Sequence, residues 1–164
     1  MEIRQNVIDD LNAMTTESWR TIRIMAEMVQ ALDTLNKLDA NCVSIFGSPH
    51  EQGCNQYVKT RCNFRYFFTR KFMFVKYAMA YVVMPGGMGT IDELSEAFVL
   101  AQTGRIRPFP IILYNASYWS GLLEWLRTSM ANGRFINREE IDKLVTVCDT
   151  PEQVVEHLCK IVIL

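Results

Sequence analysis

Short apolar runs alternate with longer periodic segments along most of the chain. Four runs are apolar at nearly every position, as in strands buried on both faces of a sheet. These runs are 41–47, 81–84, 111–114 and 144–147. Between them, apolar residues recur every three or four positions, which predicts helices. The helical segments are 17–38, the second half of 63–79, 90–103, 119–130, a short piece from 137 and a last helix from 150.

This alternation predicts an α/β fold, a three-layer Rossmann-like parallel sheet with helices on both faces. We expect one nucleotide-binding domain over residues 1–164, with 1–38 as an N-terminal helical segment. The longest helix carries an apolar stripe that includes Trp19, Ile22 and Val29. We interpret that stripe as a packing surface, within the chain or between subunits.

Local signals fix two helix starts. Thr150-Pro151 followed by Gln153 is typical of a capped helix that begins with proline. Asn137 with Glu140 three residues later predicts a short capped helix.

Charge and cysteine content restrict the function. Seventeen Lys and Arg oppose eighteen Asp and Glu, a net charge of −1, which gives no basic surface for nucleic acid. The apolar run 78–84 is too short to span a bilayer, and no leader pattern opens the sequence. Five scattered cysteines without a Cys-x-x-Cys pair indicate reduced thiols and a cytoplasmic location.

The sharpest chemical signal is the segment 84–93, Met-Pro-Gly-Gly-Met-Gly-Thr-Ile-Asp-Glu, between a predicted strand and a predicted helix. Its glycines permit a tight turn, and the helix start offers N–H groups to a phosphate. The segment is neither a Walker A loop nor a dinucleotide fingerprint.

Two simpler interpretations of this segment stay open. The loop can be a strand-to-helix turn without a ligand. Thr90 with Glu93 also fits a capping box, in which Glu93 only satisfies the backbone of Thr90. The residues alone favour neither the structural nor the functional interpretation.

Residues 85–93 resemble the PGGxGTxxE signature of the LOG (Lonely Guy) family of cytokinin riboside 5′-monophosphate phosphoribohydrolases, long labelled lysine decarboxylases. The stretches 63–78, 101–104 and 110–119 are similar to this family as well. The resemblance implies a homodimer or higher homo-oligomer. We expect no metal or cofactor. The resemblance also implies hydrolysis of the N-glycosidic bond of a nucleoside 5′-monophosphate, AMP or a cytokinin riboside monophosphate, to free base and ribose 5-phosphate.

The family's functional pair maps onto Arg70, in an Arg-Lys dipeptide, and Glu93. Glu93 would stabilise an oxocarbenium-like state or activate water. Arg70 offers a charged planar fork to the phosphate or the leaving group, although by itself it also fits an ordinary surface cation. The residues expected to hold the nucleotide are Gly47, Ser48, Lys71, Gly86, Gly87, Met88, Gly89 and Thr90.

The sequence departs from the family after Ser48. About two βα units, roughly 60 residues at ~30 per unit, are missing between Ser48 and Pro49, including a second glycine-rich stretch. The alternative function is therefore a non-catalytic nucleotide-binding sensor or carrier on the same fold; a purely structural oligomerisation module is a third class.

His50 and Cys54 match no standard zinc spacing. The aromatic cluster 64–74 could stack a purine, but such a cluster more often forms core or a subunit interface.

Overall fold

A computed structural model describes residues 2–38, 40–47, 62–107 and 109–161. Its contacts divide the chain into two compact units. The first contains residues 1–39 and 59–73, and the second contains residues 40–58 and 74–164, as far as these are described. The junction between Ser48 and Pro49 lies outside the described residues.

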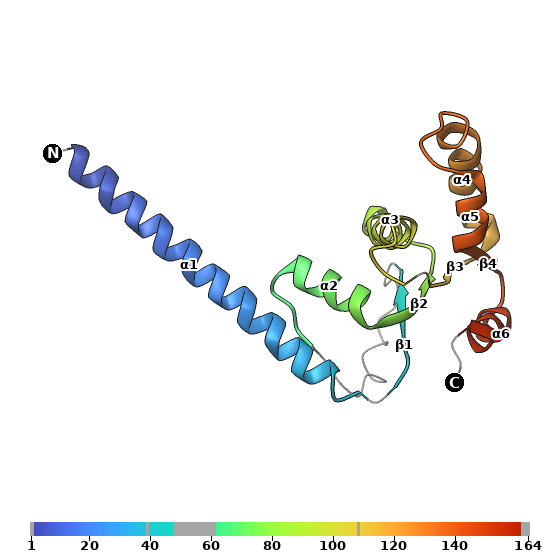
Figure 1. The fold of residues 1–164 in the computed structure, drawn as a ribbon, viewed down its shortest axis with the longest axis horizontal. Helices are drawn as coiled ribbons and strands as arrows, with labels where there is room; N and C mark the ends of the chain where they lie inside the picture. Colours follow the sequence, from blue (N-terminus) through green and yellow to red (C-terminus); the bar gives the residue numbers. More distant parts are fainter. Residues whose placement is uncertain (1, 39, 48–61, 108, 162–164) are drawn as a thin grey trace. The chain divides into compact units, whose positions relative to one another are not determined.

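The first unit is built on α1, Glu2–Leu35, the long helix at the N-terminus in Figure 1. It begins fifteen residues before the predicted start, Glu17, and ends close to the predicted end. The carboxylate of Glu27 accepts hydrogen bonds from the backbone N–H groups of Arg65 (2.9 Å) and Tyr66 (3.2 Å). These bonds fasten the middle of α1 to the segment that leads into α2, Phe67–Tyr77.

The second unit contains a parallel sheet of four strands in the order β1-β2-β3-β4. The strands are β1 (Cys42–Phe46), β2 (Ala78–Val83), β3 (Ile111–Tyr114) and β4 (Val145–Cys148). All four predicted strands are present. The prediction for β2 began three residues too late, at Tyr81.

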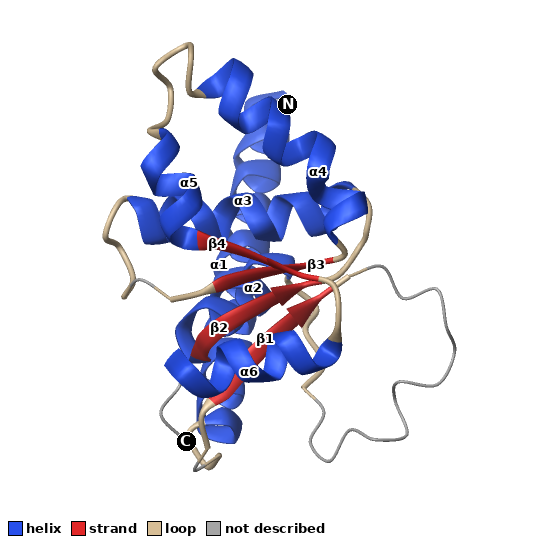
Figure 2. Ribbon diagram, turned by 90° about the vertical axis from the view of Figure 1, so that its right-hand side faces the viewer, coloured by secondary structure: helices blue, strands red, loops and turns tan. Residues whose placement is uncertain are grey.

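The helices of this unit cover both faces of the sheet, as Figure 2 shows. On one face lie α3 (Met88–Gln102), α4 (Ala116–Trp125) and α5 (Arg138–Leu144), and on the other lies α6 (Pro151–Ile161). Alternate residues of each strand face opposite sides of the sheet and belong to two separate hydrophobic clusters. Tyr81 and Ile111 pack in the cluster with α3, α4 and α5, whereas Val82 and Ile112 pack with Val154 of α6. The predicted three-layer α/β fold is confirmed.

The helix signals are confirmed at two starts. Asn137 and Glu140 form a complete capping box at α5. At α6, the Thr150 hydroxyl accepts from the Gln153 N–H and the Gln153 side chain accepts from the Thr150 N–H, both at 3.3 Å. No helix of the described residues is long and apolar enough to cross a membrane.

The predicted helix 119–130 differs from the structure in its start and in its last turn. It starts at Ala116, where the side chain of Asn115 accepts a hydrogen bond from the Tyr118 N–H. Its last turn, Leu126–Met130, is a π-helix, and the Ala131 N–H donates to the Leu126 carbonyl at 3.0 Å. Apolar periodicity marks which side of a helix is buried, so it does not reveal such a change in hydrogen bonding.

Candidate functional site

The glycine loop lies where β2 ends and α3 begins, beside the end of β1. The Met84 N–H donates to the Phe46 carbonyl at 2.7 Å. A Cβ at Gly47 would lie only 2.7 Å from the Cβ of Met84, so a side chain does not fit at this position without a shift of backbone. The structure thus brings Gly47 to the glycine loop, at the carboxyl edge where parallel α/β sheets bind ligands.

A residue from a third strand–helix connection also reaches this loop. The hydroxyl of Tyr118, in the first turn of α4, donates to the carbonyl oxygen of Gly86 at 2.5 Å. The sequence patterns did not assign Tyr118 to the site. Its position four residues after β3 was the available signal, because the carboxyl ends of β2 and β3 lie at the same edge of the sheet.

The start of α3 presents backbone donors. Gly87 is the N-cap residue, with extended backbone angles (φ −84°, ψ −160°). Its carbonyl accepts hydrogen bonds from the N–H groups of Thr90 (3.0 Å) and Ile91 (3.2 Å). Met88 and Gly89 occupy the first two helical positions, whose N–H groups have no acceptor within a helix. The backbone of this turn could therefore hold an anion such as a phosphate.

The capping-box interpretation of Glu93 is wrong. It required Thr90 to be the N-cap, but the N-cap lies three residues earlier at Gly87, and no side-chain cap bond is formed. Thr90 and Glu93 are both inside α3 and are 7% and 8% exposed. Residues three apart lie on one face of a helix, so both side chains are on the buried side of α3.

Glu93 and Glu96 act electrostatically on Tyr81 in β2. Burial raises the pKa of the Tyr81 phenol above its usual range, and the charges of Glu93 and Glu96 raise that pKa further. The phenol therefore stays protonated at neutral pH. Glu93 is five residues from the first residue of α3, or about 7.5 Å along the helix axis. Its backbone therefore lies more than one helical turn from the start of the helix, where an anion could bind.

Arg70 and Lys71 belong to the first unit and Glu93 to the second. Arg70 is exposed on α2, and its guanidinium lies 4.7 Å from the centre of the Phe67 ring; the Lys71 ammonium lies 5.3 Å from the same ring. The association of Arg70 with Glu93 stays a prediction, as does purine stacking by the aromatic cluster. Ser48 lies outside the described residues.

Metal ligation has no support among the described residues, which contain no group of three potential ligand side chains. His50 and Cys54 are not among them.

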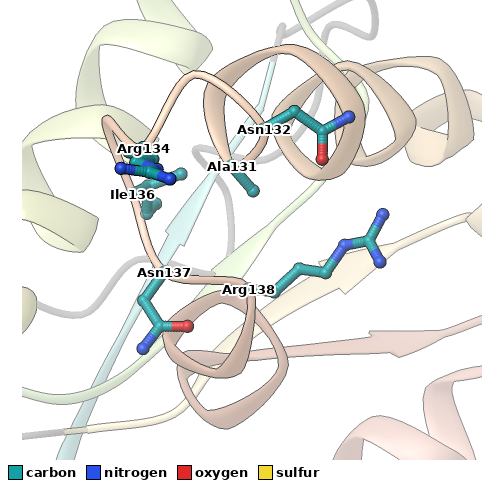
Figure 3. A pocket seen from close by; sticks show the side chains of 6 residues that line it. All are labelled: Ala131, Asn132, Arg134, Ile136, Asn137 and Arg138. Carbon is teal, nitrogen blue, oxygen red and sulfur yellow. The ribbon is translucent and has the colours of Figure 1, made fainter.

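A cavity of about 410 Å³ lies elsewhere in the second unit, between the end of the π-helical turn and the start of α5 (Figure 3). Its polar lining consists of Asn132, Arg134, Asn137 and Arg138. This lining offers cations and amides but no carboxylate.

The fold and the glycine turn place the chain among Rossmann-like α/β proteins. The family described as "Possible lysine decarboxylase" matches residues 12–158, and the chain belongs to this family. It is also similar to three curated proteins named cytokinin riboside 5′-monophosphate phosphoribohydrolase, the rice protein being named as a probable one.

These similarities are partial. The rice protein (Oryza sativa subsp. japonica) is 32% identical over 90 residues, which cover 54% of this chain and 36% of the relative. The Mycobacterium marinum protein is 29% identical over 70 residues, 43% of this chain and 37% of the relative. The Arabidopsis thaliana protein is 31% identical over 104 residues, 55% of this chain and 47% of the relative. The chain thus spans between about a third and a half of the length of these relatives.

Proposed function

We propose that the protein hydrolyses the N-glycosidic bond of a nucleoside 5′-monophosphate, such as AMP or a cytokinin riboside monophosphate. The products are the free base and ribose 5-phosphate. The names of the three relatives support this reaction class.

The observation that carries the proposal is the position of Glu93. This residue is 8% exposed and lies inside α3, where it caps no helix. Its carboxylate lies on the same face of α3 as Thr90, because residues three apart share one face of a helix. It follows a turn whose backbone donors suit a phosphate.

Each site residue would have its own chemical role. Backbone N–H groups at Met88 and Gly89, with the hydroxyl of Thr90, would bind the 5′-phosphate. Phosphate binding would fix the sugar relative to Glu93 without touching the bond that breaks. The Glu93 carboxylate would then stabilise positive charge on the sugar as the base departs, and would take a proton from the attacking water. Arg70 would bind the phosphate or the leaving base.

The test measures free base released from AMP and from a cytokinin riboside monophosphate. We expect release by the unmodified chain and at least about a hundredfold loss in Glu93→Gln, the low end of general acid–base contributions, with nucleotide binding kept. Asp92→Asn is the matched control, since it removes the neighbouring carboxylate, which is exposed on the same helix. Equal activity of Glu93→Gln and Asp92→Asn would overturn the assignment of Glu93.

A non-catalytic nucleotide-binding sensor or carrier is the second candidate. It is favoured by the partial span of the chain, which covers 36–47% of its curated relatives. Under this alternative, the chain binds AMP in calorimetry but releases no base. The same assay therefore decides between the two candidates.

We also propose a cytoplasmic homo-oligomer. The cysteines at positions 42, 62, 148 and 159 are free thiols, which agrees with a reducing compartment. The oligomer rests on the resemblance to the LOG family.

A further inference from the structure

The cavity between the π-helical turn and α5 is lined by positively charged side chains (Figure 3). Its volume of about 410 Å³ lies within the range of about 300–1,000 Å³ that is usual for small-molecule sites. We call it the arginine cavity. Its lining consists of two arginines, two amide side chains and two apolar residues: Arg134, Arg138, Asn132, Asn137, Ala131 and Ile136.

The two arginines of the cavity come from different elements. Arg134 belongs to the loop after the π-helical turn, and Arg138 is the first residue of α5. In Figure 3, Arg138 and Asn132 lie on one side of the cavity and Arg134 lies on the other. The Arg138 Nη2 donates to the Arg127 carbonyl at 3.3 Å, which restrains the guanidinium. Because a guanidinium carries several N–H donors, Arg138 can still bind a ligand with the others.

The carboxylates at the start of α5 do not neutralise these arginines from within the cavity. The Glu140 carboxylate accepts a hydrogen bond from the Gln102 side chain at 2.8 Å. The Asp142 carboxylate pairs with Arg127 at 2.7 Å. Neither these two residues nor Glu139 line the cavity. Its described lining therefore presents two positive charges to a solute, although the whole chain has a net charge of −1.

The backbone at Arg134 is in a conformation that favours glycine. Its φ angle is +59°, in the left-handed region, which costs energy for any residue with a Cβ atom. The neighbouring Gly133 would adopt this region without that cost, but the positive φ falls on the arginine. Residues held in such conformations cluster at sites that bind ligands. The strain at Arg134 therefore agrees with a binding role for its side chain.

The charge of the lining indicates the class of ligand. A phosphate monoester carries about two negative charges at neutral pH, which two guanidinium groups balance, and the guanidinium fork fits phosphate oxygens. The amide and apolar side chains of the lining suit the organic part of such a molecule.

We propose that the arginine cavity binds a small phosphate monoester through Arg134 and Arg138. The cavity shares no lining residue with the glycine turn. The inference therefore does not rest on the proposed reaction, and the two can fail separately.

A nuclear magnetic resonance titration of the isotope-labelled full chain with glycerol 3-phosphate tests the site. At neutral pH and constant ionic strength, we expect saturable shifts of the backbone amides of residues 131–138. Arg138→Gln should raise the dissociation constant read from these amides by at least about tenfold. Arg105→Gln is the matched control, because Arg105 is exposed and lies outside the lining. Unshifted amides at 131–138, or equal dissociation constants for the two variants, would overturn the proposal.

The amides of residues 87–90 report on the glycine turn in the same spectra. Shifts at 87–90 alone would support an anion at the glycine turn and would contradict the proposal for the arginine cavity.

Arg134→Gly separates binding from folding. We expect this variant to bind glycerol 3-phosphate at least about tenfold more weakly. It should keep or raise the midpoint of urea unfolding, because glycine adopts a positive φ without a Cβ clash. Binding as tight as that of the unmodified chain would remove Arg134 from the site.

Acetate tests the class of ligand. Since acetate carries a single negative charge, we expect it to bind at least about tenfold more weakly than glycerol 3-phosphate. Equal dissociation constants for acetate and glycerol 3-phosphate would contradict a phosphate site.

Discussion

The hydroxyl of Tyr118 on α4 donates a hydrogen bond to the carbonyl oxygen of Gly86 in the glycine loop. These residues lie 32 positions apart and belong to successive strand–helix units. The bond engages the Gly86 carbonyl at the sheet edge. Because the Gly86 carbonyl shares a peptide plane with the Gly87 N–H, the bond restrains the direction of that N–H. Tyr118 thereby positions the turn on which the candidate site depends.

Removing that hydroxyl should loosen the loop. We expect Tyr118→Phe to weaken nucleotide binding several-fold and to lower the free energy of unfolding by about 1 kcal/mol, the usual net worth of one hydrogen bond. Calorimetric titration with AMP and urea unfolding measure the two effects. If Tyr118→Phe binds AMP as the unmodified chain does, Tyr118 has no positioning role.

Because Gly47 lies so close to Met84, we expect one methyl group added at position 47 to lower the stability of the fold. Gly47→Ala should destabilise the second unit by about 1–3 kcal/mol, because the new Cβ would meet the Met84 Cβ at 2.7 Å. Gly121→Ala is the control, since nothing lies within 4 Å of the place its new methyl group would take and Ala favours a helix. It should be neutral or stabilising by up to about 1 kcal/mol. Equal unfolding midpoints for the two variants would disagree with the close approach.

Thr69 on α2 offers a test of a buried hydroxyl. Its side chain is fully buried, and its Oγ1 has no hydrogen-bond partner within the described part of the chain. We expect Thr69→Val, which keeps the shape, to stabilise the protein by about 1 kcal/mol because it removes an uncompensated polar group. Thr128→Val is the control, as the Thr128 hydroxyl is exposed and bonds the Glu124 carbonyl. A clear loss of stability in Thr69→Val would refute this account.

Cys148 should resist alkylation. Burial raises the pKa of its thiol, and the nearby charge of Asp149 raises it further. At pH 8, we expect iodoacetamide to modify Cys148 at least about tenfold more slowly than the exposed Cys159, as read by peptide mass mapping. Comparable rates at the two cysteines would contradict the prediction.

The same shift in the Cys148 pKa fixes the sign of a pH effect on stability. The folded thiol keeps its proton at a pH where the unfolded thiol loses it. The thiol therefore contributes its full stabilisation when the pH is below the pKa of the unfolded-state thiol. The contribution declines as the pH rises from the unfolded-state pKa towards the higher folded-state pKa. Comparing urea unfolding of the unmodified chain and Cys148→Ala across this range isolates the contribution.

Local sequence patterns predicted those elements that depend on interactions between residues close together in the chain. The run 111–114 became β3 with the predicted bounds. The caps at Asn137 and Thr150 formed as their side chains dictate. Apolar side chains in a buried strand, and polar atoms within three residues of a free N–H, act over short distances along the chain.

The start of α3 shows where local patterns are ambiguous. Thr90 with Glu93 satisfied the sequence rule for a capping box, yet Gly87 became the N-cap. The rule considers only the spacing of side chains. The sheet adds a constraint, because β2 ends at Val83 and packing against Tyr81 and Ile111 buries the face of α3 that carries Leu94 and Ala97.

The sequence by itself determined an α/β protein with a glycine-rich turn before a helix, since residue type sets turn chemistry and periodicity. Only the tertiary structure decided that Glu93 is buried inside α3, that Gly47 meets Met84 and that Tyr118 bonds Gly86. The physical reason is that these contacts join residues far apart along the chain. The order and register of the parallel strands bring them together, and no local pattern encodes that register.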